Sequence, residues 1–116
     1  MLGKKEAIFA NLIWDNEPIN SSELVRLAEE KLHWKKSTTY TMLKRLSERG
    51  VFENKNATVK AVIPREVFYG RQSQKYVDET FGGSLPKFIA AFFGGKKLSD
   101  KQANELVQLI NEHVDT

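Results

Sequence analysis

The chain has 116 residues and a formal net charge of +3 at pH 7, with 41% hydrophobic and 28% charged residues. This length fits one domain, or a small domain with an attached oligomerisation element, and this composition excludes a wholly disordered chain. The absence of cysteine excludes disulfides, thiolate metal sites and a cysteine nucleophile.

The first part of the chain predicts two helices separated by a short break. Residues 4–15 form the first helix, and Trp14 adjoins its apolar face of Ile8, Phe9, Leu12 and Ile13. Pro18 ends this helix, and residues 18–20 have room for no more than a small strand. Asn20 with Glu23 resembles a capping box, which predicts a second helix that ends near Leu32 or Trp34.

The third predicted helix, roughly residues 36–49, has one apolar and one polar face. Its apolar face combines Thr39, Met42, Leu43 and Leu46 at helical spacing. Its opposite face carries hydrogen-bonding or cationic side chains, namely Thr38, Tyr40, Thr41, Lys44 and Arg45. Gly50 supplies the left-handed residue that commonly closes a helix. A helix that is apolar on one side and can contact bases and phosphates on the other suits a DNA major groove.

Positive charge is concentrated around this third helix. Residues 1–64 carry 11 Lys and Arg against 8 Asp and Glu, whereas residues 65–116 carry 7 against 7. The densest stretch has one anion, Glu48, and six cations, namely Lys31, Lys35, Lys36, Lys44, Arg45 and Arg49. A charge run by itself is typical of a solvated helix face, but its coincidence with the helical pattern favours a site for a polyanion.

After Gly50 the periodicity changes to that of a β-hairpin. Residues 51–53 and 58–63 predict two arms around a polar tip at 54–57, and Pro64 ends the hairpin. Three helices followed by a hairpin is the element order of a winged helix-turn-helix domain, which we place at residues 1–64. Lys55 lies in the tip, where a wing would touch the phosphate backbone. The alternative is a generic three-helix bundle with a hairpin attached.

Residues 65–116 predict a helical dimerisation region. A helix over 65–81, a short helix capped by Ser84 and a last helix capped by Ser99 are separated by glycine pairs or polar residues. Their apolar side chains exceed what one small bundle can bury, which indicates an interface. We therefore expect a homodimer whose interface includes Phe68, Tyr76, Leu85, Phe88, Ile89, Phe92, Leu106 and Ile110. The alternative is that these helices fold back on their own winged domain.

Several kinds of site are not predicted. No apolar run approaches the roughly 20 residues that span a bilayer, and the N-terminus lacks the pattern of a signal peptide, so we expect a cytoplasmic protein. His33 and His113 lie far apart and show no metal-ligand spacing, so we expect no metal and no cofactor. The Ser, His and carboxylate residues show no catalytic grouping, and Ser21, Ser22 and Ser37 fit helix caps. We therefore expect no enzyme.

Motifs along nearly the whole chain resemble those of the penicillinase-repressor family, which includes the BlaI, MecI and CopY-type regulators. The motifs are LIW ending at Trp14, the stretch HWKKSTTYTMLKRLSERGVF, Pro64-Arg65-Glu66, FGGSLPKFIAAFF and LSDKQANELVQLI. In the second of these, the family's positions are filled by Trp34, Thr38, Thr41, Arg45, Leu46 and Gly50.

The resemblance implies a homodimeric, cytoplasmic transcriptional repressor that binds a palindromic operator in an antibiotic-resistance or metal-response operon. It implies that the groove-facing residues are Ser37, Thr38, Tyr40, Thr41 and Lys44, and that Asn54 and Lys55 belong to the wing. Arg45 either grips a phosphate or packs across the domain. Because the family often has arginine where Tyr40 stands and proline where Lys36 stands, we expect a different base preference here.

Two departures from the family concern how repression is relieved. CopY-type members bind copper through a cysteine-rich C-terminus, and this chain has no cysteine. The β-lactam-responsive members are cleaved at an Asn-Phe bond and have a sensor protease as partner, whereas Ala91-Phe92 stands at that place here. The inducer therefore stays open. A different class of function, a winged helix that binds proteins without reading DNA, is the second hypothesis.

Overall fold

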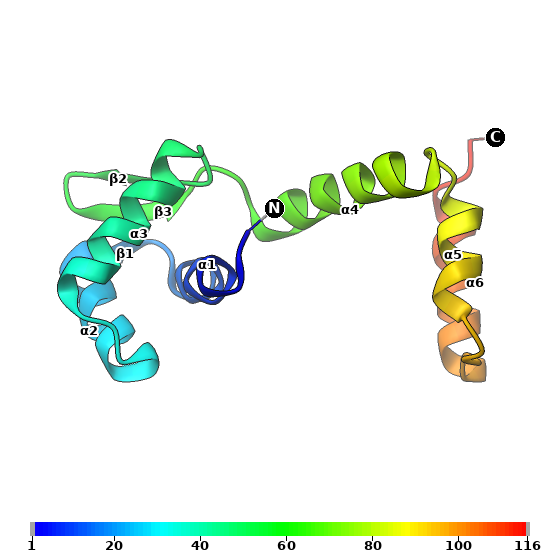
Figure 1. Cartoon of the computed structure of the whole chain (residues 1–116), viewed down its shortest axis with the longest axis horizontal. Coiled ribbons are helices and arrows are strands. Elements are labelled where there is room, and N and C mark those ends of the chain that lie inside the picture. The colour runs from blue at the N-terminus through cyan, green and yellow to red at the C-terminus, as the bar shows by residue number, and fades with distance from the viewer. Residues whose placement is uncertain (1, 116) are drawn as a thin grey trace. The chain divides into compact units, whose positions relative to one another are not determined.

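The computed structural model describes residues 2–115 and is mainly helical with a small sheet (Figure 1). The elements are α1 (Lys4–Asn16), β1 (Ile19–Asn20), α2 (Ser21–Leu32), α3 (Lys36–Glu48), β2 (Phe52–Lys55), β3 (Thr58–Ala61), α4 (Arg65–Phe81), α5 (Leu85–Phe93) and α6 (Asp100–Glu112). This architecture confirms the predicted fold class, a winged helix-turn-helix followed by a helical region. The chain forms two compact units, residues 1–75 and 76–116, which we call the winged unit and the C-terminal unit.

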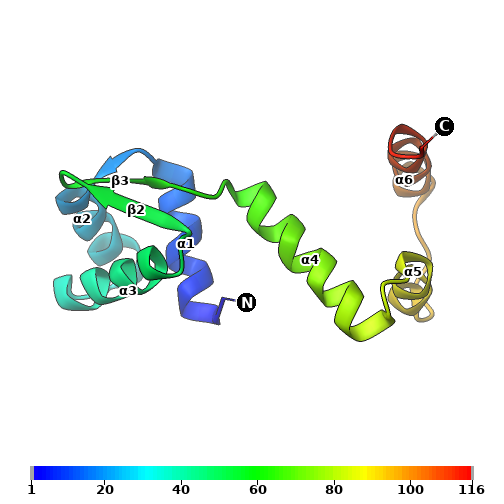
Figure 2. The ribbon, with the colours of Figure 1, turned by 90° about the horizontal axis from the view of Figure 1, so that it is seen from above.

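One hydrophobic core holds the winged unit together. Each of its three helices buries a large apolar side chain there, for example Phe9 of α1, Leu24 of α2 and Leu46 of α3. The hairpin adds Phe52 and Val59, which are also fully buried. Helix α3 contacts both α2 and strand β2 of the hairpin, and Figure 1 and Figure 2 show this unit from two sides. The core therefore fixes the position of α3 relative to the hairpin.

Trp14 ties the first turns of α4 to this core. Its ring packs against Phe52, Phe68 and Tyr69 with centroid distances of 5.2, 5.6 and 5.7 Å. Its indole N–H donates a hydrogen bond of 3.1 Å to the carbonyl of Ile63. Because Phe68 and Tyr69 pack here, the two compact units divide within α4, between Lys75 and Tyr76, whereas the sequence predicts a boundary after residue 64.

The predicted start of α2 is confirmed, but the capping role of the serines is wrong. The Asn20 side chain accepts a hydrogen bond from the Ser22 N–H, as an N-cap residue does. The N-cap of α3 is Lys35, which makes no side-chain capping bond. Ser21, Ser22 and Ser37 therefore lie inside the first turns of their helices, since α2 begins at Ser21 itself and α3 begins at Lys36, before Ser37.

The sheet has a third strand beyond the expected hairpin. Its order is β1-β3-β2 and both pairings are antiparallel, with Ile19 opposite Val59 and Phe52 opposite Ala61. The tip residues Asn56 and Ala57 have φ of 52° and 61°, the left-handed pair typical of a two-residue hairpin turn. Short as it is, β1 pairs with the central strand and so attaches the wing to the segment between α1 and α2.

The C-terminal unit is built around a small aromatic cluster. Tyr76, Phe81 and Phe88 meet edge to face, with centroid distances of 5.5 to 6.1 Å, and Phe92 lies 6.4 Å from Phe88. Ser84 and Ser99 cap α5 and α6 as predicted, each accepting a bond from the backbone N–H three residues on. Among residues 76–115 no side chain is buried.

Candidate nucleic-acid interface

The two faces of α3 differ as its sequence predicts. Thr39, Met42, Leu43 and Leu46 are buried in the core of the winged unit, with at most 9% of each residue exposed. The residues predicted to contact DNA from this segment are all exposed, namely Lys35, Lys36, Ser37, Thr38, Tyr40, Thr41, Lys44 and Arg45. The buried face thus holds the helix in place and leaves a polar, cationic face open to a ligand.

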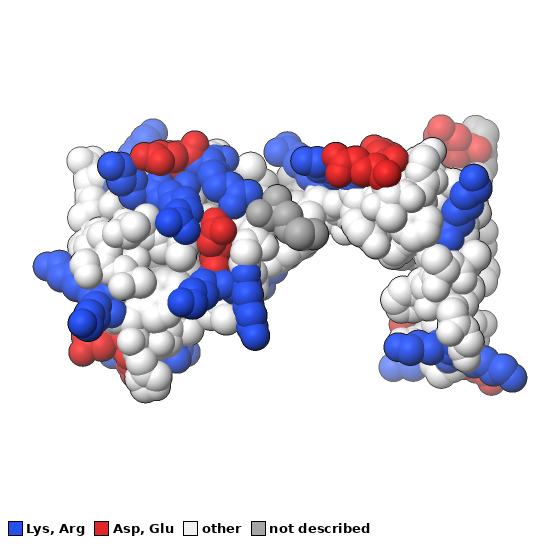
Figure 3. All heavy atoms as spheres, viewed as in Figure 1, with Lys and Arg blue, Asp and Glu red and all other residues white. Residues whose placement is uncertain are grey.

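In the part of the chain that the structure describes, the cations of this open face are not engaged in ion pairs, unlike several other cations of the winged unit. Within residues 2–115, Lys35, Lys36, Lys44 and Arg45 form none of the ion pairs that the structure contains. In contrast, Arg26, Arg49, Lys55, Lys60 and Arg65 each contact a carboxylate. Figure 3 shows basic side chains over the part of the winged unit that carries α3 and the hairpin. Unpaired ammonium and guanidinium groups are the ones that can neutralise phosphates without first breaking a salt bridge.

Tyr40 is held from two sides on the open face. Its hydroxyl donates a hydrogen bond of 3.5 Å to Oγ of Ser21, the first residue of α2. Nζ of Lys36, one turn earlier in α3, lies 6.0 Å from the centre of the Tyr40 ring. The residue is 36% exposed, so part of it stays accessible while the hydroxyl is engaged within the protein. Such a ring can contact a thymine methyl group, which is apolar recognition rather than the bidentate guanine contact of an arginine.

The β2–β3 hairpin carries the predicted wing residues. Asn54 and Lys55 are the last two residues of β2, directly before the turn, and both are exposed. Nζ of Lys55 lies 3.4 Å from Oε2 of Glu53, and Nζ of Lys60 lies 3.3 Å from Oε1 of the same carboxylate. The Lys60 ammonium, together with that of Lys55, holds the pKa of the Glu53 carboxyl below its usual value. The wing therefore carries two cations that share one anion.

Three hydrogen bonds fix the central strand of the wing to the rest of the unit. The backbone N–H of Ser21 donates to the carbonyl of Ala57 at the tip, at 2.8 Å. At the other end, the Glu17 carboxylate accepts a 2.8 Å bond from the Ala61 N–H, and Trp14 bonds to Ile63. Continuing the β1–β3 register would place residue 17 opposite residue 61, so the Glu17 side chain extends the ladder beyond the short strand. The wing is thus positioned before any ligand binds.

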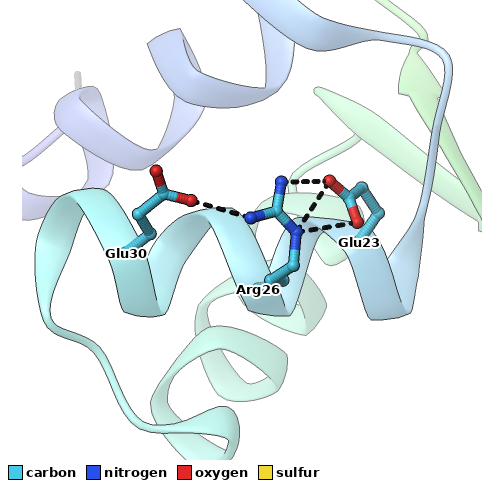
Figure 4. Close-up of polar contacts among 3 residues, drawn as sticks. All are labelled: Glu23, Arg26 and Glu30. Atoms are coloured by element: carbon cyan, nitrogen blue, oxygen red, sulfur yellow. Dashed lines mark hydrogen bonds and ion pairs between the residues drawn. The ribbon is translucent and has the colours of Figure 1, made fainter.

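The exposed surface of α2 carries its own ion-pair network, drawn in Figure 4. The Arg26 guanidinium bonds to both carboxylate oxygens of Glu23 and, at 2.8 Å, to Oε2 of Glu30. Glu23 and Glu30 lie one turn to either side of Arg26, the spacing at which helical side chains meet. The hydrogen bond from Arg26 lowers the pKa of the Glu23 carboxyl, and the two carboxylates raise the pKa of Arg26. Arg26 is therefore engaged within α2.

Comparison with known proteins agrees with this geometry. The family model described as Penicillinase repressor matches residues 2–112. The chain belongs to the penicillinase repressor family. The penicillinase repressor of Bacillus licheniformis is 26% identical over 106 residues, which are 88% of this chain and 83% of that protein. The resemblance drawn from the motifs is thereby confirmed, and the protein is a transcriptional repressor of the penicillinase-repressor type.

In this penicillinase repressor family member, most of the side chains predicted for the dimer interface lie in the C-terminal unit. The most exposed are Tyr76, Leu85, Phe92 and Ile110, with 46% to 61% of each residue accessible. Phe88, Ile89 and Leu106 are half-buried. Phe68 differs from the other seven because it packs on Trp14 in the winged unit and so has a partner within its own chain. The interface itself stays a prediction.

Neither a metal centre nor a membrane span is found in the part of the chain that the structure describes. No group of three or more His, Cys, Asp or Glu side chains within residues 2–115 could hold a metal ion. Among the same residues, no helix is both long and apolar enough to cross a membrane. A surface depression at the turn between α2 and α3 is lined by Glu29, His33, Trp34, Lys35 and Lys36, and it adjoins the open face of α3.

The sequence reasoning missed two features that shape this interface. The first is Glu53, whose place two residues before Lys55 puts both side chains on one face of β2. That alternation is readable from the sequence once the strand is placed. The second is Ser21, which contacts both the wing tip and Tyr40. These contacts join segments far apart in the chain, and no local sequence pattern predicts them.

Proposed function

We propose that this penicillinase-type repressor binds double-stranded DNA as a homodimer, with α3 in the major groove of each half of a palindromic operator. The observation that carries the proposal is the open face of α3, where cations and hydroxyl groups are exposed on a helix whose other face is locked in the core. A helix of this kind fits the major groove, and its N-terminal residues are placed to contact bases.

The roles of individual residues follow from their chemistry. Ser37, Thr38 and Thr41 can donate or accept hydrogen bonds at base edges, and Tyr40 offers its ring edge to a thymine methyl group. Lys35, Lys36 and Lys44 neutralise phosphates, and so does Arg45, since it is exposed and lies outside the core. Asn54 and Lys55 of the wing contact the backbone beside the groove. These assignments place specificity on α3 and affinity on the cations around it.

Dimerisation is proposed from the C-terminal unit. Its helices leave large apolar side chains exposed, and a second copy of the unit is the economical cover for such a surface. A twofold dimer presents two recognition helices and so requires a palindromic site. In the alternative, these helices would fold back on their own winged domain, and Phe68, which packs on Trp14, is already part of the winged unit.

We infer the regulated genes and the way in which repression is relieved from the family to which the chain belongs. The relative from Bacillus licheniformis is named for repression of a penicillinase, and we propose that this chain likewise controls an antibiotic-resistance or metal-response operon. A sensor protease is the partner expected if the response is to β-lactams. Ala91 and Phe92 lie in α5, and would replace the Asn-Phe pair in that case.

Enrichment of bound duplexes from a random-sequence pool tests the proposal without knowledge of the operator. The full-length chain should enrich an inverted repeat whose half-sites lie one helical turn or a multiple of it apart. Binding to that duplex should saturate and should weaken linearly in log affinity against log salt. Failure to enrich any sequence, together with salt-independent binding, would contradict the proposal and favour a protein-binding winged helix.

A further inference from the structure

Glu53 is the carboxylate at the centre of the wing's charge. It contacts the two lysines of the hairpin at once, Oε2 to Lys55 at 3.4 Å and Oε1 to Lys60 at 3.3 Å. Its side chain is 25% exposed, whereas the side chains of Lys55 and Lys60 are 77% and 57% exposed. The ammonium groups therefore reach out to solvent while one shared anion lies between them and the strand.

The strand register explains why the three side chains meet. Glu53 lies directly opposite Lys60 in the β2–β3 ladder, and Lys55 follows Glu53 by two residues on the same face. The other face of the hairpin points to the core through Phe52 and Val59. The arrangement is thus set by backbone pairing in an anchored wing, and it exists in the free protein.

Among the described residues, the lysines of the wing are engaged in ion pairs, whereas the cations of α3 are not. Lys44 and Arg45 form no ion pair within the described residues, so a phosphate can contact them without displacing a carboxylate. A phosphate that approaches Lys55 or Lys60 has to compete with the Glu53 carboxylate and is also repelled by it. The carboxylate stays ionised at neutral pH, because both lysines favour its charged form.

We propose that Glu53 limits the sequence-independent DNA affinity of this repressor, because Lys55 and Lys60 must leave its carboxylate before they can contact phosphates. It is a positioning residue that acts through the two lysines. The benefit is that less protein is held at the many nonspecific sites of a genome, which compete with an operator for the repressor. This inference rests on the proposed DNA-binding function and deepens it.

The test compares Glu53→Gln with the matched control Glu30→Gln, using the full chain and a random-sequence duplex over a salt series. Both changes remove one negative charge from an exposed ion-pair network. The control releases no cation, since Arg26 keeps its bonds to Glu23. Glu53→Thr serves as a second variant, because threonine suits a strand and also removes the carboxylate. Circular dichroism verifies that all variants are folded.

We expect Glu53→Gln and Glu53→Thr to raise the affinity for the duplex by about 2- to 10-fold at low salt. The slope of log affinity against log salt should steepen by about 0.9 for each lysine released. In a Lys55→Gln/Lys60→Gln background the same change at Glu53 should have no more effect than Glu30→Gln. These results together support the inference.

Three results would overturn it. The first is a Glu53 variant that behaves like the Glu30 control, and the second is a loss of affinity, which would mean that the carboxylate prepares the lysines for phosphate. The third is a gain in affinity that persists without the two lysines, which would mean that Glu53 acts only by long-range repulsion of the DNA. In each case wild-type binding to the duplex is intact, so the proposed function survives. Absence of any wild-type binding would remove both.

Discussion

Ala57 has a backbone conformation that an alanine rarely adopts. Its φ of 61° lies in the left-handed region, where a Cβ crowds the following carbonyl and costs roughly 1–2 kcal/mol. The two-residue turn explains the conformation, because it needs positive φ at both positions and favours Asn-Gly there. Here the second position is alanine, so the wing tip carries strain that the bond between Ser21 N–H and Ala57 offsets in part.

Replacing Ala57 with glycine should therefore stabilise the winged unit by about 1 kcal/mol. Urea denaturation followed by circular dichroism measures the change. Ala61→Gly in β3 is the control, and it should destabilise by at least roughly 0.5–1 kcal/mol, because a glycine inside a strand adds chain entropy to the unfolded state and removes a methyl group that packs against the core. Equal effects of the two changes would show that the tip is not strained.

The two faces of α3 should respond oppositely to alanine. Leu46→Ala removes a fully buried side chain and should cost about 2–5 kcal/mol of folding free energy. Lys44→Ala removes an exposed side chain and should change stability by no more than about 0.5 kcal/mol, while it weakens DNA binding. Thermal melts and duplex titrations of both variants check this separation. A Lys44 variant that unfolds, or that binds as well as wild type, would contradict the assigned face.

At the scale of elements, acid should weaken the ion pairs that Glu23 and Glu53 form with their cationic neighbours. The pKa values of Glu23 and Glu53 are lowered from 4.5 by Arg26 and by Lys60 with Lys55, respectively. A lowered folded-state pKa contributes stability above the unfolded value, and that contribution disappears as pH falls through the folded value. The free energy of unfolding should therefore decline below about pH 4.5, and less steeply in a Glu23→Gln/Glu53→Gln variant. Parallel declines in the two proteins would contradict this origin.

Most elements were predictable because their signals are local. Helix α4 begins and ends at the predicted residues, since Pro64 precedes it and a glycine pair follows it. The polar face of α3 could be predicted because the spacing of Thr39, Met42 and Leu43 identifies the buried side. What the sequence did not reveal depends on pairing between distant segments, such as β1 with β3 and Glu17 with Ala61. Such pairings need the fold before they can be inferred.

At the scale of the whole molecule, the exposed apolar surface of the C-terminal unit predicts a dimer. Ile110→Asp places a charge on that surface, where 51% of Ile110 is accessible in the single chain. A charge left unpaired in an interface is strongly unfavourable, so the variant should be monomeric while the wild type shows twice the chain mass. Light scattering after size exclusion measures both. Glu105→Gln is the control on the same helix, and a wild-type monomer would contradict the prediction.

In the proposed function, the cations around α3 supply the affinity for DNA. Four of them, Lys35, Lys36, Lys44 and Arg45, are exposed and lack a carboxylate partner in the described structure. If they neutralise phosphates, each of them should contribute to the slope of log affinity against log salt. Four cations of the C-terminal unit provide a control with the same change in net charge, namely Lys87, Lys96, Lys97 and Lys101.

The most direct test is the slope of log affinity against log salt for a duplex, compared between these two fourfold alanine variants. We predict that the α3 variant binds more weakly at low salt, and that its slope is shallower by about 0.9 for each phosphate that the protein–DNA complex no longer neutralises. The C-terminal variant should keep the wild-type slope. Equal slopes in all three proteins would contradict the claim that α3 is the DNA-binding element.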